Sequence, residues 1–519
     1  MKQRHLRILR IIISVALLFL TSVLFVDFRE WVSPAWADRI LFLQFLPSLI
    51  RFITLPAVAA AGFFIVLVIT ALFGRVYCSS VCPLGIFQDL FTWFSRKSGL
   101  VKRFKFKKAL NYLRYPLLAL ALIFILSGTL YVLNLIEPYS SFGRIFSDLV
   151  RPGIIVVNNG LAGLLERFDK YFLFRMNLQL ITWHTVWIPV VTLVLIMWLS
   201  LYYGRLYCNS ICPVGTILGL LSRISLFKIK MDASTCTKCG KCSFACKSSC
   251  IRVKTMEVDF SRCIACYDCI TVCPESSIRY ERTLFQKKPD GFVPSKRDFI
   301  GKTLLYVIAL AGISKKSFGI VPTERPAGKI PNKKNYPVSP PGSVGLKHFI
   351  DRCTACHLCV TVCPTGVLQP SFLEYGFTGM MQPHMDYSVE YCNFECVKCG
   401  EVCPTGAILP LTVEDKKLEQ NGQVTFILEK CIVYTDNTAC GSCSEHCPTQ
   451  AVKMVPYKQT TLTIPETDKN ICIGCGACEF ACPVKPHTAI YVDGNAVHQV
   501  AKKPKIEELK VQTEDAFPF

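Results

Sequence analysis

A chain of 519 residues is long enough for three soluble domains, but its composition argues against a wholly soluble protein. Apolar types make up 51% of the residues and charged types 18%, below the roughly 25% of soluble proteins, and the mean hydropathy is +0.37. The net charge of +21 does not indicate a nucleic-acid binder, because the excess cations cluster beside apolar runs, and 29 cysteines in so long a chain exclude a small disulfide scaffold.

Five apolar runs predict membrane helices, since a spanning helix needs about 20 apolar residues. They are Ile11–Val26, Phe52–Gly74, Tyr115–Ile136, the run between Arg175 and Arg205, and the shorter Thr303–Ile313. We therefore expect an α-helical membrane domain over residues 1–230 with four helices, and a fifth helix later in the chain. The alternative for the first run is a cleaved signal peptide, but its cleavage-like Ala35-Trp36-Ala37 lies too far downstream.

Basic residues predict the orientation of these helices. The loop 75–114 carries nine basic residues and one acidic residue, whereas the loop 137–175 carries five and four. We expect the N-terminus and the loop 75–114 in the cytoplasm, and the chain after Arg205 starts there too. The basic stretch 96–108 resembles a nucleic-acid tail, but topology and lipid headgroups explain it better.

Two segments of the membrane half repeat one pattern, G-R-x-Y-C-x3-C-P-x-G, at 74–85 and 204–215. Cysteines four residues apart share a face of a helix, and repeated units usually enclose a site between them. The four repeat cysteines, as we call them, are Cys78, Cys82, Cys208 and Cys212. Three interpretations stay open: ligands of an additional cluster, redox-active thiols near a quinone, or reduced structural cysteines. The recurring Pro and Gly favour a functional site.

Residues 231–294 contain two cysteine blocks with the spacing of bacterial two-cluster ferredoxins. In this pattern a tight loop directs three thiolates at one [4Fe–4S] cluster, and the fourth cysteine of each block ligates the other cluster. The predicted ligand sets are Cys236, Cys239, Cys242 and Cys273 for one cluster, and Cys263, Cys266, Cys269 and Cys246 for the other. Lys247 replaces the usual Pro, and Cys250 is expected to be a small buried residue.

Four further blocks lie in residues 346–519, each ending in Cys-Pro. They are Cys353, Cys356, Cys359 and Cys363; Cys392, Cys396, Cys399 and Cys403; Cys431, Cys440, Cys443 and Cys447; and Cys472, Cys475, Cys478 and Cys482. These blocks can pair as nested sets, first with fourth and second with third, or as neighbours, and the ligand set is the same either way. The two inner blocks share irregular spacing, so we favour nested pairing. Disulfides or zinc sites are the alternatives, but neither usually repeats C-x2-C-x3-C-P. The chain is thus expected to end in two α+β domains like bacterial ferredoxins, with six [4Fe–4S] clusters in all.

The segment 295–320 joins these two parts. Its Ser295-Lys296-Arg297-Asp298-Phe299 is similar to a twin-arginine export signal, with Lys296 in place of the first Arg, and the apolar run after it is the expected fifth helix. Such signals export folded, cofactor-bearing cargo, so we expect the last domain in the periplasm; an ordinary surface helix is the alternative. Residues 321–345 are rich in Pro and predict an extended linker.

With these motifs the membrane half resembles the NapH-type membrane iron–sulfur proteins, and the remainder resembles their NapG-type (MauM/NapG) partners, as a fusion of two proteins that are usually separate. The resemblance implies a protein of the bacterial inner membrane that oxidises quinol and passes electrons to a periplasmic cytochrome or reductase. It would act as a quinol dehydrogenase component or as an electron carrier, with no catalytic side chains of its own.

Two points remain open within this hypothesis. Quinol is expected to dock between the repeat helices, where His184 could assist deprotonation, although a packed interfacial histidine is the interpretation we favour. The alternative function is a maturation or sensing factor that supplies electrons for assembly of another protein's metal centre. A third hypothesis is a soluble ferredoxin array whose apolar helices form a core.

Overall fold

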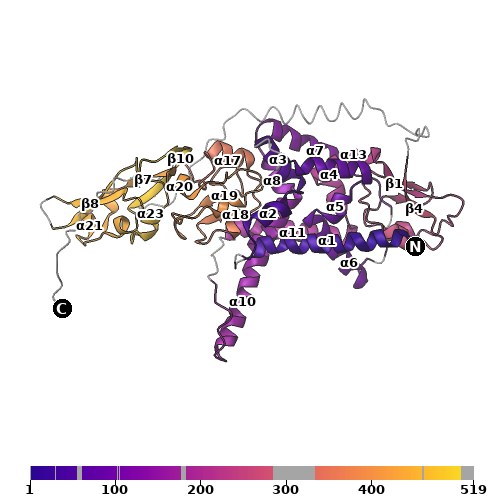
Figure 1. The fold of residues 1–519 in the computed structure, drawn as a ribbon, viewed down its shortest axis with the longest axis horizontal. Helices are drawn as coiled ribbons and strands as arrows, with labels where there is room; N and C mark the ends of the chain where they lie inside the picture. Colours follow the sequence, from indigo (N-terminus) through magenta and orange to yellow (C-terminus); the bar gives the residue numbers. More distant parts are fainter. Residues whose placement is uncertain are drawn as a thin grey trace, which may run out of the picture.

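The chain forms an elongated molecule in which a bundle of helices separates two cysteine-rich parts (Figure 1). The computed structural model describes residues 2–283 and 334–503, apart from 28, 30, 55–60, 102, 105, 177–182 and 459–460. The export-signal-like segment 295–320 lies outside the described residues.

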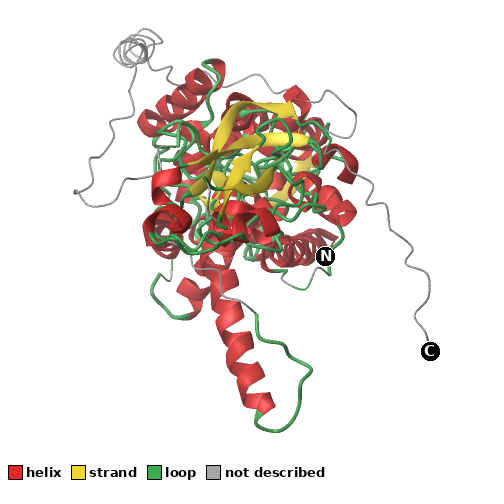
Figure 2. Cartoon of the chain, turned by 90° about the vertical axis from the view of Figure 1, so that its left-hand side faces the viewer, coloured by secondary structure: helices red, strands yellow, loops and turns green. Residues whose placement is uncertain are grey.

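The helical part consists of residues 2–224. Its elements are α1 (Lys2–Val26), α2 (Pro34–Leu41), α3 (Phe45–Thr54), α4 (Gly62–Phe73), α5 (Val76–Ser80), α6 (Pro83–Lys97), α7 (Asn111–Leu126), α8 (Tyr131–Ile136), α9 (Pro138–Ile145), the π-helix η2 (Phe146–Val150), α10 (Arg151–Glu166), α11 (Trp183–Tyr203), α12 (Leu206–Ser210), α13 (Pro213–Leu221) and the 3-10 helix η3 (Ser222–Ile224). The long helix α1 runs along one side of the bundle over its whole length, whereas α10 projects from it (Figures 1 and 2).

Two described helices are long and apolar enough to cross a membrane, α1 and α11. The predicted run Tyr115–Ile136 is wrong as a single helix: α7 ends at Leu126, Gly128 follows with φ +81°, and α8 begins at Tyr131. A left-handed glycine just after a helix is the usual way to end it, which explains the break. The run 52–74 contains the end of α3 and the 12-residue α4. The expectation of four spanning helices stays a prediction.

The apolar helices turn large side chains outward as well as inward. Exposed apolar residues occur along four of them, at Ile12 and Phe19 of α1, at Phe64 and Val68 of α4, at Leu122 and Leu126 of α7, and at Val191 and Trp198 of α11. Only about a third of each long span is buried, 28% in α1 and 33% in α11. The core helix of a soluble protein is mostly buried, so these helices do not have the burial of a soluble core.

The first cysteine-rich part, residues 227–282, is built on two small antiparallel sheets. Its elements are β1 (Phe227–Met231), α14 (Lys241–Ala245), β2 (Ile251–Arg252), β3 (Glu257–Val258), α15 (Asp268–Thr271) and β4 (Ile278–Arg282). Strand β1 pairs with β4, and β2 pairs with β3. We call this part the two-site domain.

The second cysteine-rich part, residues 334–503, holds three more antiparallel strand pairs, β5 with β6, β7 with β10, and β8 with β9. Its elements are α17 (Leu346–Arg352), α18 (Leu358–Thr361), β5 (Leu368–Pro370), β6 (Pro383–Met385), α19 (Lys398–Glu401), α20 (Val413–Lys416), β7 (Glu419–Phe426), η4 (Leu428–Lys430), α21 (Ile432–Thr435), α22 (Ser442–Glu445), β8 (Val452–Pro456), β9 (Thr463–Thr467), α23 (Ala477–Ala481) and β10 (Ile490–Val500). We call this part the four-site domain.

Residues 334–345, which we expected to belong to an extended linker, pack against strand β10. Asn335 bonds to Asp493 through its backbone N–H, and Gly345 forms a β-bridge with Val497. Val338 is 2% exposed. The buried side chain of Val338 and the backbone contacts with β10 thus hold residues 334–345 in place, although their composition predicts an extended, unpacked segment.

Candidate functional site: six ferredoxin-like cysteine sites and four cysteines of the repeat

Each regular cysteine block folds as a tight loop followed by one helical turn. The residue after the second cysteine is left-handed in four blocks, at Gly240, Tyr267, His357 and Gly476, where it begins α14, α15, α18 and α23. This conformation costs little at glycine and about 1–2 kcal/mol at other residues. The inner blocks, with their irregular spacing, have Val397 and Gly441 at this position with negative φ.

The thiols assemble into groups of four. Each group is named after its first block: the Cys236 site (Cys236, Cys239, Cys242, Cys273), the Cys263 site (Cys263, Cys266, Cys269, Cys246), the Cys353 site (Cys353, Cys356, Cys359, Cys403), the Cys392 site (Cys392, Cys396, Cys399, Cys363), the Cys431 site (Cys431, Cys440, Cys443, Cys482) and the Cys472 site (Cys472, Cys475, Cys478, Cys447). Within each group the fourth thiol comes from the other block of a pair and interacts electrostatically with thiols of the first.

The nested pairing predicted for the last four blocks is wrong. Cys403 of the second block joins the first block, and Cys482 of the fourth block joins the third. Adjacent blocks share one apolar core each, one around Phe349 and another around Val433. Blocks that are adjacent in the sequence are joined by short connections and can therefore pack into one shared core. Irregular spacing within a block changes only the shape of its loop.

The arrangement fits iron–sulfur clusters. Two small cavities are each lined by the four thiols of one group, those of the Cys392 site and those of the Cys431 site. All 29 cysteines are free, which contradicts the disulfide alternative. In the described part of the chain no three His, Cys, Asp or Glu side chains are close enough to hold a single metal ion.

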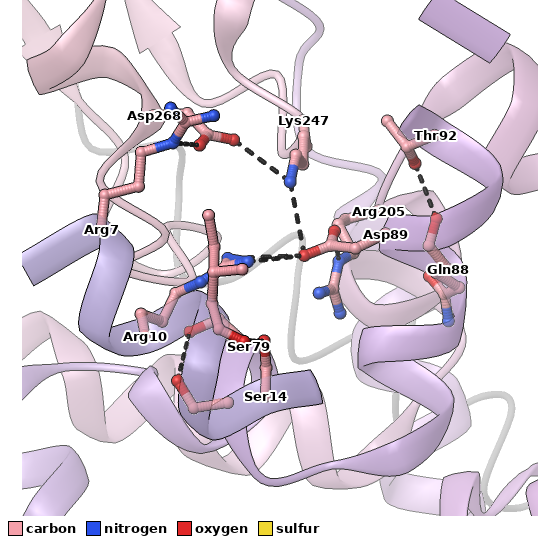
Figure 3. Close-up of polar contacts among 12 residues, drawn as sticks. Arg7, Arg10, Ser14, Ser79, Gln88, Asp89, Thr92, Arg205, Lys247 and Asp268 are labelled. Atoms are coloured by element: carbon pink, nitrogen blue, oxygen red, sulfur yellow. Dashed lines mark hydrogen bonds and ion pairs between the residues drawn. The ribbon is translucent and has the colours of Figure 1, made fainter. Parts of the chain in front are cut away.

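The two-site domain docks on the helical part through a buried network of charges (Figure 3). At its centre, the Asp89 carboxylate of α6 accepts from Arg205 Nε at 2.9 Å and lies 3.4 Å from Lys247 Nζ. Lys247 also pairs with Asp268 at 3.1 Å. Lys247, which departs from the expected Pro, therefore joins the domain to the bundle, because its carbonyl also accepts from the N–H of Arg205 at 3.0 Å.

The N-terminus of α1 contributes two more cations to this network. Arg7 Nε lies 2.8 Å from Asp268, and Arg10 Nη2 lies 3.3 Å from Asp89. Burial alone would raise the pKa of Asp89, but Arg205, Lys247 and Arg10 hold this pKa well below its usual range. The carboxylate is thus ionised at neutral pH and neutralises cations from three segments.

The basic stretch 96–108 also contacts the two-site domain. Arg96 donates to the carbonyl of Ala245 at 2.7 Å, and the carbonyl of Lys107 accepts from Arg262 at 2.8 Å.

Cys250, expected to be a buried small residue, is 1% exposed, with its Sγ 3.5 Å from that of Cys246.

The four-site domain docks at the opposite end of α1. His357, between two cysteines of the Cys353 site, lies with Nδ1 2.9 Å from the Asp148 carboxylate of η2 and with Nε2 2.8 Å from the carbonyl of Met381. Arg144 donates to the carbonyl of Ala355 at 3.1 Å, and Arg151 to that of Thr361 at 2.9 Å. The Cys353 site thereby rests on α9 and η2.

The repeat cysteines lie between these two docking faces. Cys78 and Cys208 belong to α5 and α12, and Cys82 and Cys212 immediately precede α6 and α13. All four are at most 4% exposed. The Cys212 thiol interacts electrostatically with the three others, so the two repeats bring their cysteines together.

A pair of arginines that the sequence motifs did not single out crosses between the repeats. Arg75 of the first repeat donates to the carbonyl of Cys208 at 3.2 Å, and Arg205 of the second donates to that of Cys78 at 2.9 Å. Both guanidinium groups are 0% exposed. The invariant arginine of the repeat pattern was the available signal. His184, the candidate quinol residue, lies in α11, but its side chain is outside the described part.

Comparison with known proteins agrees with this assignment. A family described as "4Fe-4S binding domain" matches 55–100 and 183–232, which contain the two repeats. Two families described as "4Fe-4S dicluster domain" match 352–408 and 430–486, in agreement with pairing of adjacent blocks, and a further "4Fe-4S binding domain" matches 256–279.

Several known proteins are similar to parts of the chain. The "Ferredoxin-type protein NapF" of Escherichia coli (strain K12) is 28% identical over 160 residues, 31% of this chain and 88% of NapF. The "Methylamine utilization ferredoxin-type protein MauN" of Paracoccus denitrificans is 29% identical over 33% of this chain and 48% of MauN. The "Ferredoxin-type protein NapH" of Haemophilus influenzae is 26% identical over 35% of this chain and 50% of NapH. The matches thus span about half of MauN and NapH. The chain is an iron–sulfur electron-transfer protein related to these ferredoxin-type proteins.

Proposed function

We propose that the protein is anchored in the bacterial inner membrane, oxidises quinol there, and delivers electrons through the four-site domain to a soluble redox partner. The exposed apolar side chains of α1, α4, α7 and α11 support the membrane location, because so large an apolar surface is unusual on a soluble protein. The soluble-array hypothesis would need these side chains buried.

The positions of the two docking faces support a topology with one cysteine-rich domain on each side. Arg7, near the start of α1, pairs with Asp268 of the two-site domain, whereas Phe25, near its end, packs on Phe142 of α9, where the four-site domain docks. Twenty-five helical residues span about 37 Å, more than the roughly 30 Å of a bilayer core. We place the two-site domain in the cytoplasm and the four-site domain in the periplasm.

The observation that carries the quinol proposal is a cavity of about 700 Å³ at the outer end of α1. It lies between α1, α10 and the four-site domain, and its wall includes Cys363 of the Cys392 site. Apolar side chains such as Leu24 and Ile155 line it together with charged ones such as Arg151. Its size and mixed lining suit an amphipathic molecule with a polar head and an apolar tail.

The residues of the cavity fit the chemistry of quinol oxidation, in which one quinol gives one quinone, two protons and two electrons. Asp27 and Glu401 line the cavity and are the proposed proton acceptors. Arg151, whose Nε is buried without a hydrogen-bond partner in the described structure, is available to orient a quinol oxygen. Iron–sulfur clusters held by the neighbouring cysteines exchange electrons singly. This location replaces docking between the repeat helices.

The cysteine sites of the four-site domain form a row leading away from this cavity. The Cys392 site is next to the Cys472 site, because the N–H of Cys392 donates to the carbonyl of Cys475 at 2.9 Å. The Cys431 site lies beyond it, near α21 at the far end of the molecule (Figure 1). The far end is therefore the proposed docking place of the soluble partner.

Quinol-dependent reduction of the purified protein tests the proposal. A short-chain quinol added anaerobically to the full chain in nanodiscs is expected to bleach the iron–sulfur absorbance. Arg151→Gln is expected to slow this reduction by about tenfold or more, because a hydrogen bond from a charged group is lost. Arg167→Gln, at the exposed end of the same helix, is the matched control and is expected to behave as the wild type.

Dithionite separates the two parts of the proposal. If quinol leaves every site oxidised while dithionite reduces them all, the protein still transfers electrons but quinol is not the donor. If Arg151→Gln is reduced by quinol at the wild-type rate, the cavity is not the site of oxidation.

A further inference from the structure

The two repeats bury two arginines, Arg75 and Arg205, and only one of them has an acidic partner. Arg205 has a carboxylate partner, Asp89, but the oxygen acceptors of Arg75 are neutral: Asn209 Oδ1 at 2.9 Å, and the carbonyls of Ser261 and Cys208 at 3.2 Å each. A fully buried cation without a counter-charge costs several kcal/mol. The groups nearby that can supply negative charge are the repeat cysteines.

Both arginines already point at these sulfurs. Arg75 Nη2 lies 3.6 Å from Cys78 Sγ, and Arg205 Nη1 lies 3.9 Å from Cys208 Sγ. Three further buried N–H groups next to the cysteines have no hydrogen-bond acceptor in the described structure, those of Arg75 Nε, Arg205 Nη2 and Gln88 Nε2. Buried donors rarely stay unpaired, so their number here indicates that an acceptor belongs in this place.

We propose that the four repeat cysteines together hold one iron–sulfur cluster, shared between the two repeats. Each repeat supplies two thiols, and a [2Fe–2S] or [4Fe–4S] cluster needs four ligands, so neither repeat can hold a cluster alone. With four thiolates, the oxidised form of either cluster carries a net charge of about −2, which supplies the counter-charge that Arg75 lacks and adds to the single carboxylate that Arg205 shares with Arg10 and Lys247. Its sulfide atoms are acceptors for the unpaired N–H groups.

The glycines of the pattern support this design. A Cβ at Gly85 would lie 2.6 Å from Arg205 Nη1, and one at Gly215 would lie 2.9 Å from Arg75 Nη2. Each repeat thus leaves space for the arginine of the other, which reaches across to the cysteines. This explains why Arg, both Cys and Gly recur together at matching offsets.

The shared site lies on a path of buried groups between the two docking faces. On one side, Arg75 and Arg114 both donate to the carbonyl of Ser261, two residues before Cys263. On the other side, Tyr207 and Tyr77 of the repeats interact electrostatically with Glu137, which in turn interacts with Cys356. The cluster would therefore connect the Cys263 site with the Cys353 site across the bundle, independently of whether quinol is the donor.

Iron and acid-labile sulfide contents test the proposal on the full chain, purified anaerobically in detergent. We expect about 24 iron atoms from the six ferredoxin-like sites and about 2 or 4 more from the shared site, and the excess tells [2Fe–2S] from [4Fe–4S]. The double variant Cys82→Ser/Cys212→Ser is expected to lose the excess alone, with one electron paramagnetic resonance signal, while Cys250→Ala loses none. An unchanged iron and sulfide content in the double variant would overturn the proposal.

Two measurements keep the test decisive if the double variant does not fold. In the wild type, alkylation followed by mass spectrometry is expected to leave the repeat cysteines unmodified until iron is chelated under mild denaturation; a disulfide between them, or bound zinc in place of iron, contradicts the proposal. Arg75→Gln keeps all ligands but removes a positive charge, so it is expected to lower the midpoint potential of one signal by at least about 59 mV. At a fixed applied potential, this corresponds to a tenfold lower ratio of reduced to oxidised cluster. Arg75→Lys is expected to restore part of the shift. No shift in any signal contradicts the charge argument.

Discussion

The two repeats are nearly identical in sequence, but their buried arginines have different partners. Counting from the cysteines, Asp89 of the first repeat corresponds to Gly219 of the second. Arg205 consequently pairs with a carboxylate, whereas Arg75 has neutral acceptors. A Cβ at Gly219 would lie 2.4 Å from the carbonyl of Ser261, so this position is kept small for the two-site domain.

This difference separates two roles that one motif combines. The cysteines, the crossing arginines and the glycines Gly85 and Gly215 are arranged alike in both repeats, as a shared central site requires. The residues that face the two-site domain differ: Asp89 of the first repeat forms an ion pair with Lys247, whereas Gly219 of the second repeat leaves room for the carbonyl of Ser261. The two repeats are therefore symmetric around the cysteines and asymmetric where they contact the two-site domain.

The largest effect is expected from Asp89→Asn, which removes the asymmetric charge. It leaves Arg205, Arg10 and Lys247 buried without their shared carboxylate, and breaking a buried ion pair in this way costs about 3–5 kcal/mol. We expect a lower thermal unfolding midpoint in detergent and easier proteolytic release of the two-site domain. Glu257→Gln, in an exposed pair with Arg252, is the control and should cost less than about 1 kcal/mol.

The same network predicts a dependence on pH. Burial would raise the pKa of Asp268, yet Lys247 and Arg7 lower it, and the pKa of Asp89 is also lowered. A carboxylate whose pKa falls on folding stabilises the folded state above its unfolded pKa of about 3.9, and this stabilisation is lost as the pH falls through the folded value. Docking of the two-site domain should therefore be constant between pH 8 and 5 and weaken below about 4. Weakening already between pH 7 and 6 would contradict the assignment.

An intermediate effect is expected from adding a methyl group to the symmetric glycines. In Gly85→Ala and Gly215→Ala the new Cβ would lie 2.5 Å and 2.2 Å from the carbonyl oxygens of Cys78 and Cys208, so the backbone must shift. Overpacking of this kind costs about 1–3 kcal/mol. The two variants should be destabilised equally, because the repeats are symmetric here, whereas Gly160→Ala in the open surface of α10 should not be destabilised. A large difference between the two would show that the symmetry of the centre is only apparent.

Local chemistry made the cysteine groups predictable, whereas long-range packing did not follow from the sequence. The C-x2-C-x2-C loop directs three thiols inward by itself, so its members could be named from spacing. Which block supplies the fourth thiol depends on the core that two blocks share, and the irregular spacing of the inner blocks suggested the wrong partner for Cys403 and Cys482. Irregular spacing shared by two blocks describes the shapes of their loops, and it does not show that the two blocks are in contact.

The departures from pattern were visible, but their meaning required the structure. Lys247 stood out in place of Pro, yet its partner Asp89 is in another domain, far away in the sequence. The break after Leu126 had a local signal in Gly128, which an apolar count over Tyr115–Ile136 ignores. Counting hydrophobic residues measures affinity for an apolar environment and not the continuity of a helix.

The smallest effect is expected at the two tyrosines of the repeats, which lie between the cysteines and the face where the four-site domain docks. The Tyr207 hydroxyl donates to the carbonyl of Ile136 at 2.8 Å, whereas the Tyr77 hydroxyl donates to Gln44 Oε1 at 3.3 Å and also accepts from the N–H of Phe45 at 3.2 Å. Removing a hydroxyl costs about 0.5–1.5 kcal/mol for each hydrogen bond that is lost, and a buried donor left without an acceptor costs more. Tyr77→Phe loses two hydrogen bonds and takes the acceptor from a buried N–H, so it should lower the thermal unfolding midpoint more than Tyr207→Phe, with iron content unchanged in both. The reverse order would mean that the single bond from Tyr207 to the backbone directly before Glu137 and α9 stabilises the bundle more than both bonds of Tyr77.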